Sequence, residues 1–486
     1  MKKILSVVII MMIVFILSSC SNPYGGGGYL NEDYINEVND DEHQIIVENP
    51  FINTEVNNKS NISLSANTAA YSFIRSQINA GRPVDPNVVR IEEMVNFFKY
   101  DYNEPIDDDI FGFKSELIQT PWNSETHLLM VGLETKTMDL GDVPTNLVLL
   151  IDVSGSMSSG NKLPLVKQSV MLLVEQMKPQ DTISLVTYSS GEKVVFKGKT
   201  IDDFNYINTQ IERLSASGAT AGERGLQMAY EVAEEYFIEG GNNRIVLATD
   251  GDFNVGISNT DQLIEFISDK RQSGIYFSAF GFGYGNFKDE KLERIAAAGN
   301  GVYHYIDDML SARKAFIDNI DGLLYTVARD AKAQIEFNSD AVLEYRLIGY
   351  ENRQLSNDEF NDETTDAGEI GTGLQVTAIY ELKLKETSTN DLADLTIRYK
   401  SHDVADETQL EKVFTVLNAV QTSPSKDADF ISSIVEFGLI LINSQYKVDA
   451  DIDRVIERIQ SDEDLEDDYY RNDFLDLLQK YKLIIG

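Results

Sequence analysis

The chain has 486 residues, 43% hydrophobic and 25% charged, which is ordinary for a globular protein of about two to four domains. Its 41 Lys and Arg against 79 Asp and Glu give a net charge of −38, and a surface of that sign repels phosphate backbones, so we expect no nucleic-acid partner. The single cysteine excludes both an intramolecular disulfide and a cysteine-rich zinc module.

The first nineteen residues have the pattern of a bacterial lipoprotein signal peptide. Lys2 and Lys3 precede an apolar run from Ile4 to Leu17, which is shorter than the ~20 residues that a membrane-spanning helix needs. Leu17-Ser18-Ser19-Cys20 then resembles a lipobox, whose cysteine is acylated and becomes the mature N-terminus. We expect residues 1–19 to be removed and Cys20 to anchor the protein to a bacterial membrane, in the cell envelope outside the cytoplasm. A plain signal peptide and an uncleaved anchor are the alternatives.

Two segments are expected between the anchor and the first large domain. Residues 20–63 contain the Gly25–Gly28 run and an acidic stretch, which predicts a flexible tether with order beginning near Ser63. Residues 64–135 show helical spacing at first and strand-like alternation from Phe111 to Leu133, which predicts a small N-terminal α+β module.

Residues 144–326 alternate between short apolar runs and helical patterns. Strands are expected at 146–151, 182–188, 244–249 and 275–280, and helices at 163–177, 201–214, 224–237, 260–271, 288–298 and 307–325. Such alternation predicts an α/β fold with a doubly wound, mostly parallel, Rossmann-like sheet. Ligands of these sheets bind beyond the carboxyl ends of the strands, near the point where the strand order reverses.

The remainder of the chain divides into two parts. Residues 327–420 alternate with a period of two, which predicts a C-terminal antiparallel β module, a sandwich. Residues 425–486 return to helical spacing and are expected to form a helical tail.

Hydroxyl and carboxylate side chains follow two of the predicted strands. Asp152-Val153-Ser154-Gly155-Ser156 begins at the end of the 146–151 strand, and Asp250 follows the 244–249 strand. Thr220 stands in a loop before a helix. These loops can converge on one point, and their side chains offer only hard oxygen ligands, which suit Mg²⁺. The sequence therefore predicts a metal centre made of Asp152, Ser154, Ser156, Thr220 and Asp250.

The 144–326 block resembles the von Willebrand factor type A domain and matches its metal-ion-dependent adhesion site at every position. The resemblance implies that Ser154, Ser156 and Thr220 ligate Mg²⁺ or Mn²⁺, while Asp152 and Asp250 act directly or through water. It also implies a protein partner whose acidic side chain completes the coordination sphere. By analogy, the terminal helix at 307–325 shifts on binding and passes a signal to the β module.

A wider resemblance extends over residues 64–486, where the chain is similar to the YfbK-like subgroup of bacterial lipoproteins. Its motifs are Tyr71-Ser72-Phe73-Ile74-Arg75, Arg90 to Phe98, Ala248 to Gly256, Tyr345 to Glu351, Gly368-Glu369-Ile370-Gly371 and Tyr470-Arg471. The chain departs from the subgroup at Glu223-Arg224, where small residues are usual, so charge stands beside the metal rim.

Other patterns favour different chemistry less well. Asp250-x-Asp252-x-Asn254 opens like a calcium loop, but Val255 stands where that loop has glycine, and a strand precedes it. Ser159-x-x-Lys162 lacks the partner motifs of a serine acyl-enzyme. Glu92 and Glu93 are adjacent on a helix, face different directions and cannot act as a paired acid and base.

We therefore expect a lipid-anchored adhesion or scaffold protein that binds another protein through Mg²⁺ and is not an enzyme. An accessory subunit of an enzyme complex, or a metal-dependent hydrolase, is the alternative. A metal site with a structural role alone is a third possibility.

Overall fold

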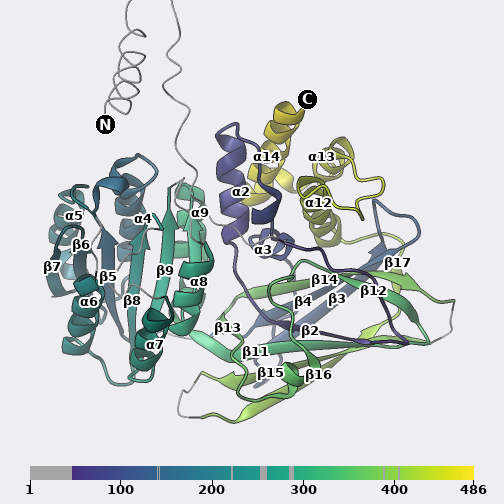
Figure 1. Cartoon of the computed structure of the whole chain (residues 1–486), viewed down its shortest axis with the longest axis horizontal. Coiled ribbons are helices and arrows are strands. Elements are labelled where there is room, and N and C mark those ends of the chain that lie inside the picture. Colours follow the sequence, from purple (N-terminus) through teal and green to yellow (C-terminus); the bar gives the residue numbers. More distant parts are fainter. Residues whose placement is uncertain are drawn as a thin grey trace, which may run out of the picture. The chain divides into compact units, whose positions relative to one another are not determined.

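The computed structural model describes residues 46–138, 141, 143–219, 223–251, 260–283, 289–386, 389–402 and 406–486 (Figure 1). The expected signal peptide, Cys20, most of the expected tether and Thr220 lie outside the described residues. Within these ranges, every helix is too short or too polar to cross a membrane.

The first large sheet has six strands in the order β10-β9-β8-β5-β6-β7. The strands are β5 (Thr145–Asp152), β6 (Thr182–Tyr188), β7 (Glu192–Lys199), β8 (Asn242–Thr249), β9 (Ile275–Phe282) and β10 (Tyr303–Ile306). All neighbours are parallel except β6 and β7. The chain leaves the central strand β5 toward β6 on one side and later returns to β8 on the other. The strand order therefore reverses at β5, and the crevice beyond its carboxyl end is the expected ligand position.

Helices cover both faces of this sheet (Figure 1). Side chains on alternate positions of β5 enter two different cores: Leu147 and Leu149 pack with α4 (Leu163–Glu175) and α5 (Phe204–Glu212). Val148 and Leu150 pack with the other set of helices, namely α6 (Glu223–Glu235), α7 (Thr260–Arg271) and α8 (Asp289–Ala298). The doubly wound α/β fold predicted from the apolar runs is confirmed.

The terminal helix expected at 307–325 is broken into three pieces. These are α9 (Met309–Arg313), a π-helical turn (Lys314–Asp318) and α10 (Ile320–Leu324), which lie on the α4 face. The next strand begins directly at Thr326, so this segment connects the sheet to the β sandwich.

Two further sheets form the sandwich. One has the order β1-β12-β14-β4-β3-β17, and the other has β13-β11-β15-β16 with β2 paired to β11. Their strands are β1 (Ile52–Asn53), β2 (Lys59–Ser63), β3 (Phe111–Gln119), β4 (His127–Thr135), β11 (Thr326–Phe337), β12 (Val342–Ile348), β13 (Gly368–Gly371), β14 (Gln375–Leu384), β15 (Asp391–Ser401), β16 (Gln409–Leu417) and β17 (Val420–Gln421). Side chains such as Leu129, Val131, Ile335 and Leu395 fill one common core.

This arrangement corrects two predicted boundaries. The separate module expected at 64–135 is wrong, because β3 and β4 lie inside the sandwich beside β14. The expected tether at 20–63 extends too far, because β1 and β2 are strands of the same sandwich. The sequence of β2, KSNIS, resembles that of a loop, because Ile62 is its single large apolar residue. In the fold, the Asn61 side chain donates hydrogen bonds to the Leu355 carbonyl and to Asn357 Oδ1.

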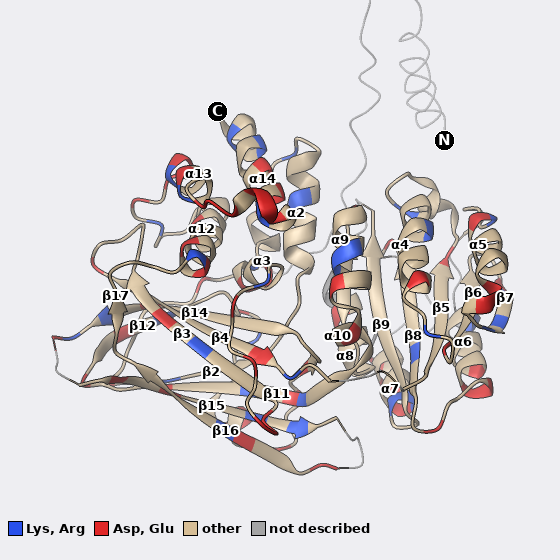
Figure 2. Ribbon diagram, turned by 180° about the vertical axis from the view of Figure 1, so that it is seen from behind, with Lys and Arg blue, Asp and Glu red and all other residues tan. Residues whose placement is uncertain are grey.

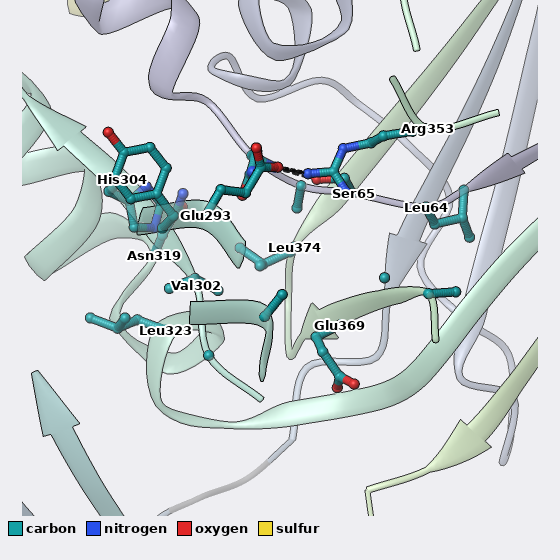
Figure 3. Close-up of a pocket in the computed structure, with 17 residues that line it drawn as sticks. Leu64, Ser65, Glu293, Val302, His304, Asn319, Leu323, Arg353, Glu369 and Leu374 are labelled. Carbon is teal, nitrogen blue, oxygen red and sulfur yellow. Dashed lines mark hydrogen bonds and ion pairs between the residues drawn. The ribbon is translucent and has the colours of Figure 1, made fainter. Parts of the chain in front are cut away.

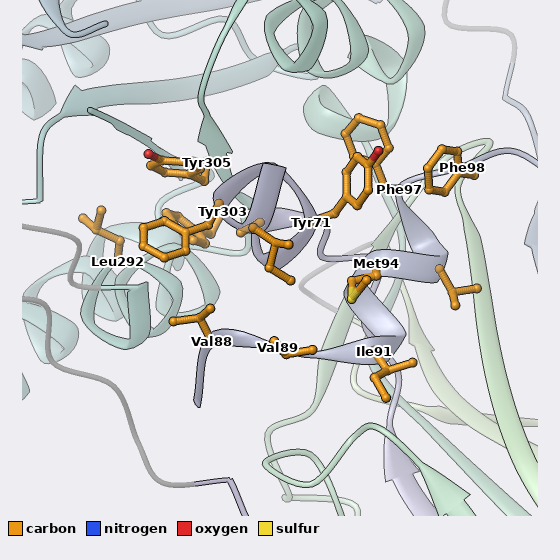
Figure 4. Close-up of a cluster of buried hydrophobic side chains, with 14 of the residues drawn as sticks. Tyr71, Val88, Val89, Ile91, Met94, Phe97, Phe98, Leu292, Tyr303 and Tyr305 are labelled. Carbon is orange, nitrogen blue, oxygen red and sulfur yellow. The ribbon is translucent and has the colours of Figure 1, made fainter. Parts of the chain in front are cut away.

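A helical bundle from both ends of the chain completes the fold. Its helices are α2 (Ala69–Asn79), α3 (Ile91–Asn96), α12 (Lys426–Leu441), α13 (Ile452–Gln460) and α14 (Tyr469–Ile485), with short helical turns at Pro86–Val88 and Leu465–Asp467. Elsewhere, a short turn at Ile201–Asp203 precedes α5, and the short helix α11 (Asn357–Asn361) lies against β2 and β11 of the sandwich. Figure 4 shows Tyr71 beside Phe97, and their ring centroids are 4.4 Å apart. Phe73 also contacts Tyr305 of β10, with centroids 5.5 Å apart, so one apolar core joins the bundle to the first sheet.

Acidic side chains are spread over the described surface rather than gathered on one element. Figure 2 shows Asp and Glu on helices as different as α5, α13 and α14. In this view the negative charge is spread over several elements and does not by itself mark a site.

Candidate metal centre

The two predicted aspartates lie at the same edge of the first sheet. The strand β5 ends at Asp152, and Asp250 follows the last residue of β8. The two strands are parallel neighbours, with Ile151 paired to Ala248, so their carboxyl ends are adjacent. Both side chains are buried, since Asp152 is 0% and Asp250 is 4% exposed.

The turn after β5 places the two serine hydroxyls side by side. Asp152 Oδ1 accepts a hydrogen bond of 2.8 Å from the backbone N–H of Ser154, which fixes the first bend. A short helical turn, Gly155–Ser158, follows at once. It brings Ser154 Oγ within 2.9 Å of Ser156 Oγ. The D-x-S-x-S spacing thus presents two hydroxyls to one point.

The loop that precedes Thr220 is tied to this turn. The backbone N–H of Ser217 donates to the carbonyl of Val153 (2.8 Å), and that of Gly155 donates to the carbonyl of Gly218 (2.9 Å). Ser190 Oγ accepts from the backbone N–H of Ala219 at 2.7 Å. Thr220 itself lies outside the described residues, but Ser217, Gly218 and Ala219, which precede it, are held at this turn.

The burial of the two carboxylates is electrostatically costly. Burial raises the pKa of Asp152 to about 6, hydrogen bonds from Ser154 lower it, and the nearby charge of Asp250 raises it again. Thr249 Oγ1 adds only a long hydrogen bond of 3.4 Å to Asp152 Oδ2. Two buried acids at one point are stabilised when a cation shares their environment.

The residues present fit a small oxygen-liganded cation. Asp250 Oδ1 is buried and accepts no hydrogen bond from the described residues, so this oxygen keeps its lone pairs for another partner. Among the described residues, no three His, Cys, Asp or Glu side chains gather as a carboxylate- or thiolate-rich centre would need. Two carboxylates with hydroxyls suit Mg²⁺, which keeps several waters. Asp252 and Asn254 of the calcium-loop alternative lie outside the described residues.

Lys162, which no sequence pattern places at this centre, contacts it. Lys162 Nζ lies 3.0 Å from Asp250 Oδ2, and Lys162 is 8% exposed. The two residues are 88 positions apart, and helical or strand periodicity does not reveal such a contact.

A separate small cavity, of about 60 Å³, lies between the first sheet's helices and the sandwich. Figure 3 shows Glu293 paired with Arg353 across it, with His304 and Glu369 in its wall. Burial lowers the pKa of His304 to about 4, so this ring is neutral near pH 7, and burial raises the pKa of Glu369 well above its usual value. The Glu293 and Arg353 charges are already paired with each other, and the cavity is small.

A doubly wound sheet with this constellation beyond β5 and β8 defines a protein of the von Willebrand factor type A class. Residues 146–319 match the family model "von Willebrand factor type A domain", and residues 37–130 match "von Willebrand factor". Residues 322–390 and 382–484 match "Uncharacterized protein YfbK, C-terminal". The chain belongs to the YfbK family of von Willebrand factor type A proteins.

Proteins of known sequence and structure are similar to this chain to different extents. The protein YfbK of Escherichia coli (strain K12), itself uncharacterized, is 36% identical over 464 residues, covering 90% of this chain and 80% of that protein. The uncharacterized protein sll0103 of Synechocystis is 29% identical over 36% of this chain and 40% of its own length. A solved von Willebrand factor type A protein from Catenulispora acidiphila covers 70% of this chain and 80% of its own, with 15% identity and a TM-score of 0.39.

Proposed function

We propose that this protein is a metal-dependent adhesion or scaffold lipoprotein that captures an acidic side chain of a partner protein. Ser154, Ser156 and Thr220 would ligate Mg²⁺ or Mn²⁺, and Asp152 and Asp250 would orient its waters and balance its charge. One observation carries the proposal: two buried carboxylates and two adjacent hydroxyls meet at the reversal point of the sheet, with Asp250 Oδ1 still open.

The donor set explains why a carboxylate would be the ligand. Hydroxyl ligands are neutral, so a cation held mainly by them keeps most of its positive charge. An incoming Glu or Asp of a partner can then displace a bound water and form a strong ion–dipole and charge interaction. Von Willebrand factor type A domains commonly act in protein interactions and bind divalent metal, which supports this reading.

Capture in Mg²⁺ tests the proposal. The full-length protein, immobilised and exposed to a membrane extract, should retain defined partners in Mg²⁺ and release them in EDTA. Asp152→Ala should retain none of them. Partner binding that persists unchanged in EDTA and in Asp152→Ala would refute the metal-dependent mechanism, and turnover of a substrate panel would favour the hydrolase alternative.

The cellular location of the protein is a separate part of the proposal. Cys20 would carry a lipid and place the protein outside the cytoplasm, anchored to a membrane. Labelling cells with a palmitate analogue should mark the wild type and leave a Cys20→Ser variant unmarked. Labelling of both proteins would show that the lipid is not on Cys20.

A further inference from the structure

We propose that Lys162 is a built-in counter-cation of the metal centre, which lowers the affinity of the centre for metal and strengthens its attraction for a carboxylate. This inference rests on the function proposed above and concerns the same site. It assigns to Lys162 a role in setting the charge of the centre, not in coordination.

The contact between Lys162 and the centre is short and buried. Lys162 Nζ donates to Asp250 Oδ2 at 3.0 Å, and the side-chain exposures are 10% and 0%. The ammonium engages only one of the two oxygens, because Oδ1 accepts nothing from the described residues. The lysine therefore neutralises Asp250 without occupying Oδ1.

The absence of a side chain at Gly283 leaves space for the methylene groups of Lys162. Lys162 precedes α4 and must pass Gly283, at the end of β9, to reach Asp250. A Cβ on Gly283 would lie 2.4 Å from Lys162 Cε and 2.5 Å from Cγ, so a larger residue there would push the stem away. Gly283 has φ +85°, and its carbonyl accepts a 2.7 Å hydrogen bond from the buried Tyr305 hydroxyl, which holds the backbone in place.

Lys162 changes the net charge of the centre by one unit, both with and without a bound metal. Asp152 and Asp250 contribute −2 and Lys162 contributes +1, so the centre without metal has a charge of −1. A divalent cation brings it to +1. Without Lys162 the same two states would be −2 and 0. Removing the lysine should therefore strengthen metal binding and weaken the pull of the loaded centre on a carboxylate.

Titration of the full-length protein with Mn²⁺, followed by electron paramagnetic resonance, measures the first effect. Lys162→Met and Lys162→Gln should each bind Mn²⁺ about tenfold more tightly than the wild type, the change expected for one nearby unit charge. Lys162→Arg keeps the charge and should stay within about twofold. Lys167→Met is the matched control: it removes a nearby lysine, within α4, whose Nζ donates to the Glu212 carbonyl, and it should not change the affinity.

Two further readouts distinguish a charge role from a purely structural one. The melting temperature should rise more with Mn²⁺ in Lys162→Met than in the wild type, because the cation replaces the missing charge. In the loaded proteins, N-acetylglutamate α-amide should displace metal-bound water, seen by water-proton relaxation, at several-fold lower concentration in the wild type than in Lys162→Met.

The outcomes separate this inference from the function on which it rests. A wild type that binds no Mn²⁺, or binds it as well as Asp152→Ala does, would overturn the metal centre and this inference together. A wild type that binds Mn²⁺ through Asp152, with unchanged affinity in both neutral Lys162 variants, would overturn this inference alone.

Discussion

Arg75 on α2 forms a bidentate ion pair with Asp307, the residue that follows β10. The guanidinium Nε lies 2.9 Å from Asp307 Oδ2 and Nη2 lies 2.6 Å from Oδ1. Arg75 is fully buried and also contacts Asp308 and Asp473, at 2.5 and 3.2 Å. One side chain thus joins the first sheet to α2 and α14 of the helical bundle.

This junction bears on how a signal would leave the metal centre. Asp308 accepts hydrogen bonds from the first turn of α9, the segment expected to shift on binding. Lys314, in the π-helical turn, lies over the ring of Tyr470 of α14 at 4.8 Å. The segment from α9 to α10 therefore contacts the helical bundle and leads directly into the sandwich. A shift of this segment would move its contacts with both.

Arg75→Met should destabilise the protein by about 3–5 kcal/mol, because it leaves Asp307 buried without its cationic partner. Urea unfolding followed by circular dichroism measures the change. Lys59→Met, which removes the exposed pair of Lys59 with Glu336 at 3.2 Å, should cost less than about 1 kcal/mol. Equal effects of the two substitutions would contradict the role assigned to Arg75.

Gly218→Ala should damage the loop beside Thr220. Gly218 has φ +82°, and a Cβ there would lie 2.4 Å from Ser190 Oγ, the atom that holds the Ala219 amide. We expect a loss of about 1–3 kcal/mol of stability and weaker Mg²⁺ binding. Gly191→Ala, whose Cβ would meet nothing within 4 Å, is the control and should resemble the wild type in both assays. A Gly218→Ala variant with wild-type Mg²⁺ affinity would separate this loop from the centre.

Glu92 and Glu351 should make the stability of the protein fall as pH rises. Burial, then the charge of Glu351, raises the pKa of Glu92 to about 7, and burial raises the pKa of Glu351 to about 7. Arg90, Arg346, Glu48 and backbone hydrogen bonds also face the pair, and the cationic groups and hydrogen bonds lower these pKa values.

Between the unfolded pKa of about 4.3 and pH 7, the folded chain holds a proton that the unfolded chain has released. The contribution of the pair is therefore fully present below about pH 4 and is lost as pH rises through 7. Glu92→Gln should flatten this slope and be more stable than the wild type at pH 8 by about 1–3 kcal/mol. Parallel stability curves for the two proteins from pH 5 to 8 would show that Glu92 does not hold an extra proton in the folded chain.

The sequence predicted those parts of the fold in which the pattern is local. The apolar run at 146–151 indicates a buried parallel strand, and β5 spans Thr145–Asp152. The edge strand β7 and the four-residue β10 were not predicted, since one is half exposed and the other is too short to show a period. The sandwich was divided wrongly because β2 pairs with β11, more than 260 positions away.

The candidate site shows the same division. Asp152, Ser154 and Ser156 share one turn, and their spacing alone indicates that they act together. Lys162 reaches Asp250 only through the path over Gly283, and Arg75 meets Asp307 across 232 positions. Such contacts depend on how the elements pack, and no periodic pattern encodes them.

Calorimetric titration of Mg²⁺ into the wild type and into a Ser154→Ala/Ser156→Ala double variant tests the metal centre most directly, because the variant keeps both carboxylates and Lys162. We predict one Mg²⁺ per wild-type chain. The affinity of the variant should be at least about tenfold lower, since each of its two substitutions removes one hydroxyl ligand. Equal affinity in the two proteins, or no Mg²⁺ bound to the wild type, would contradict a centre built on these hydroxyls.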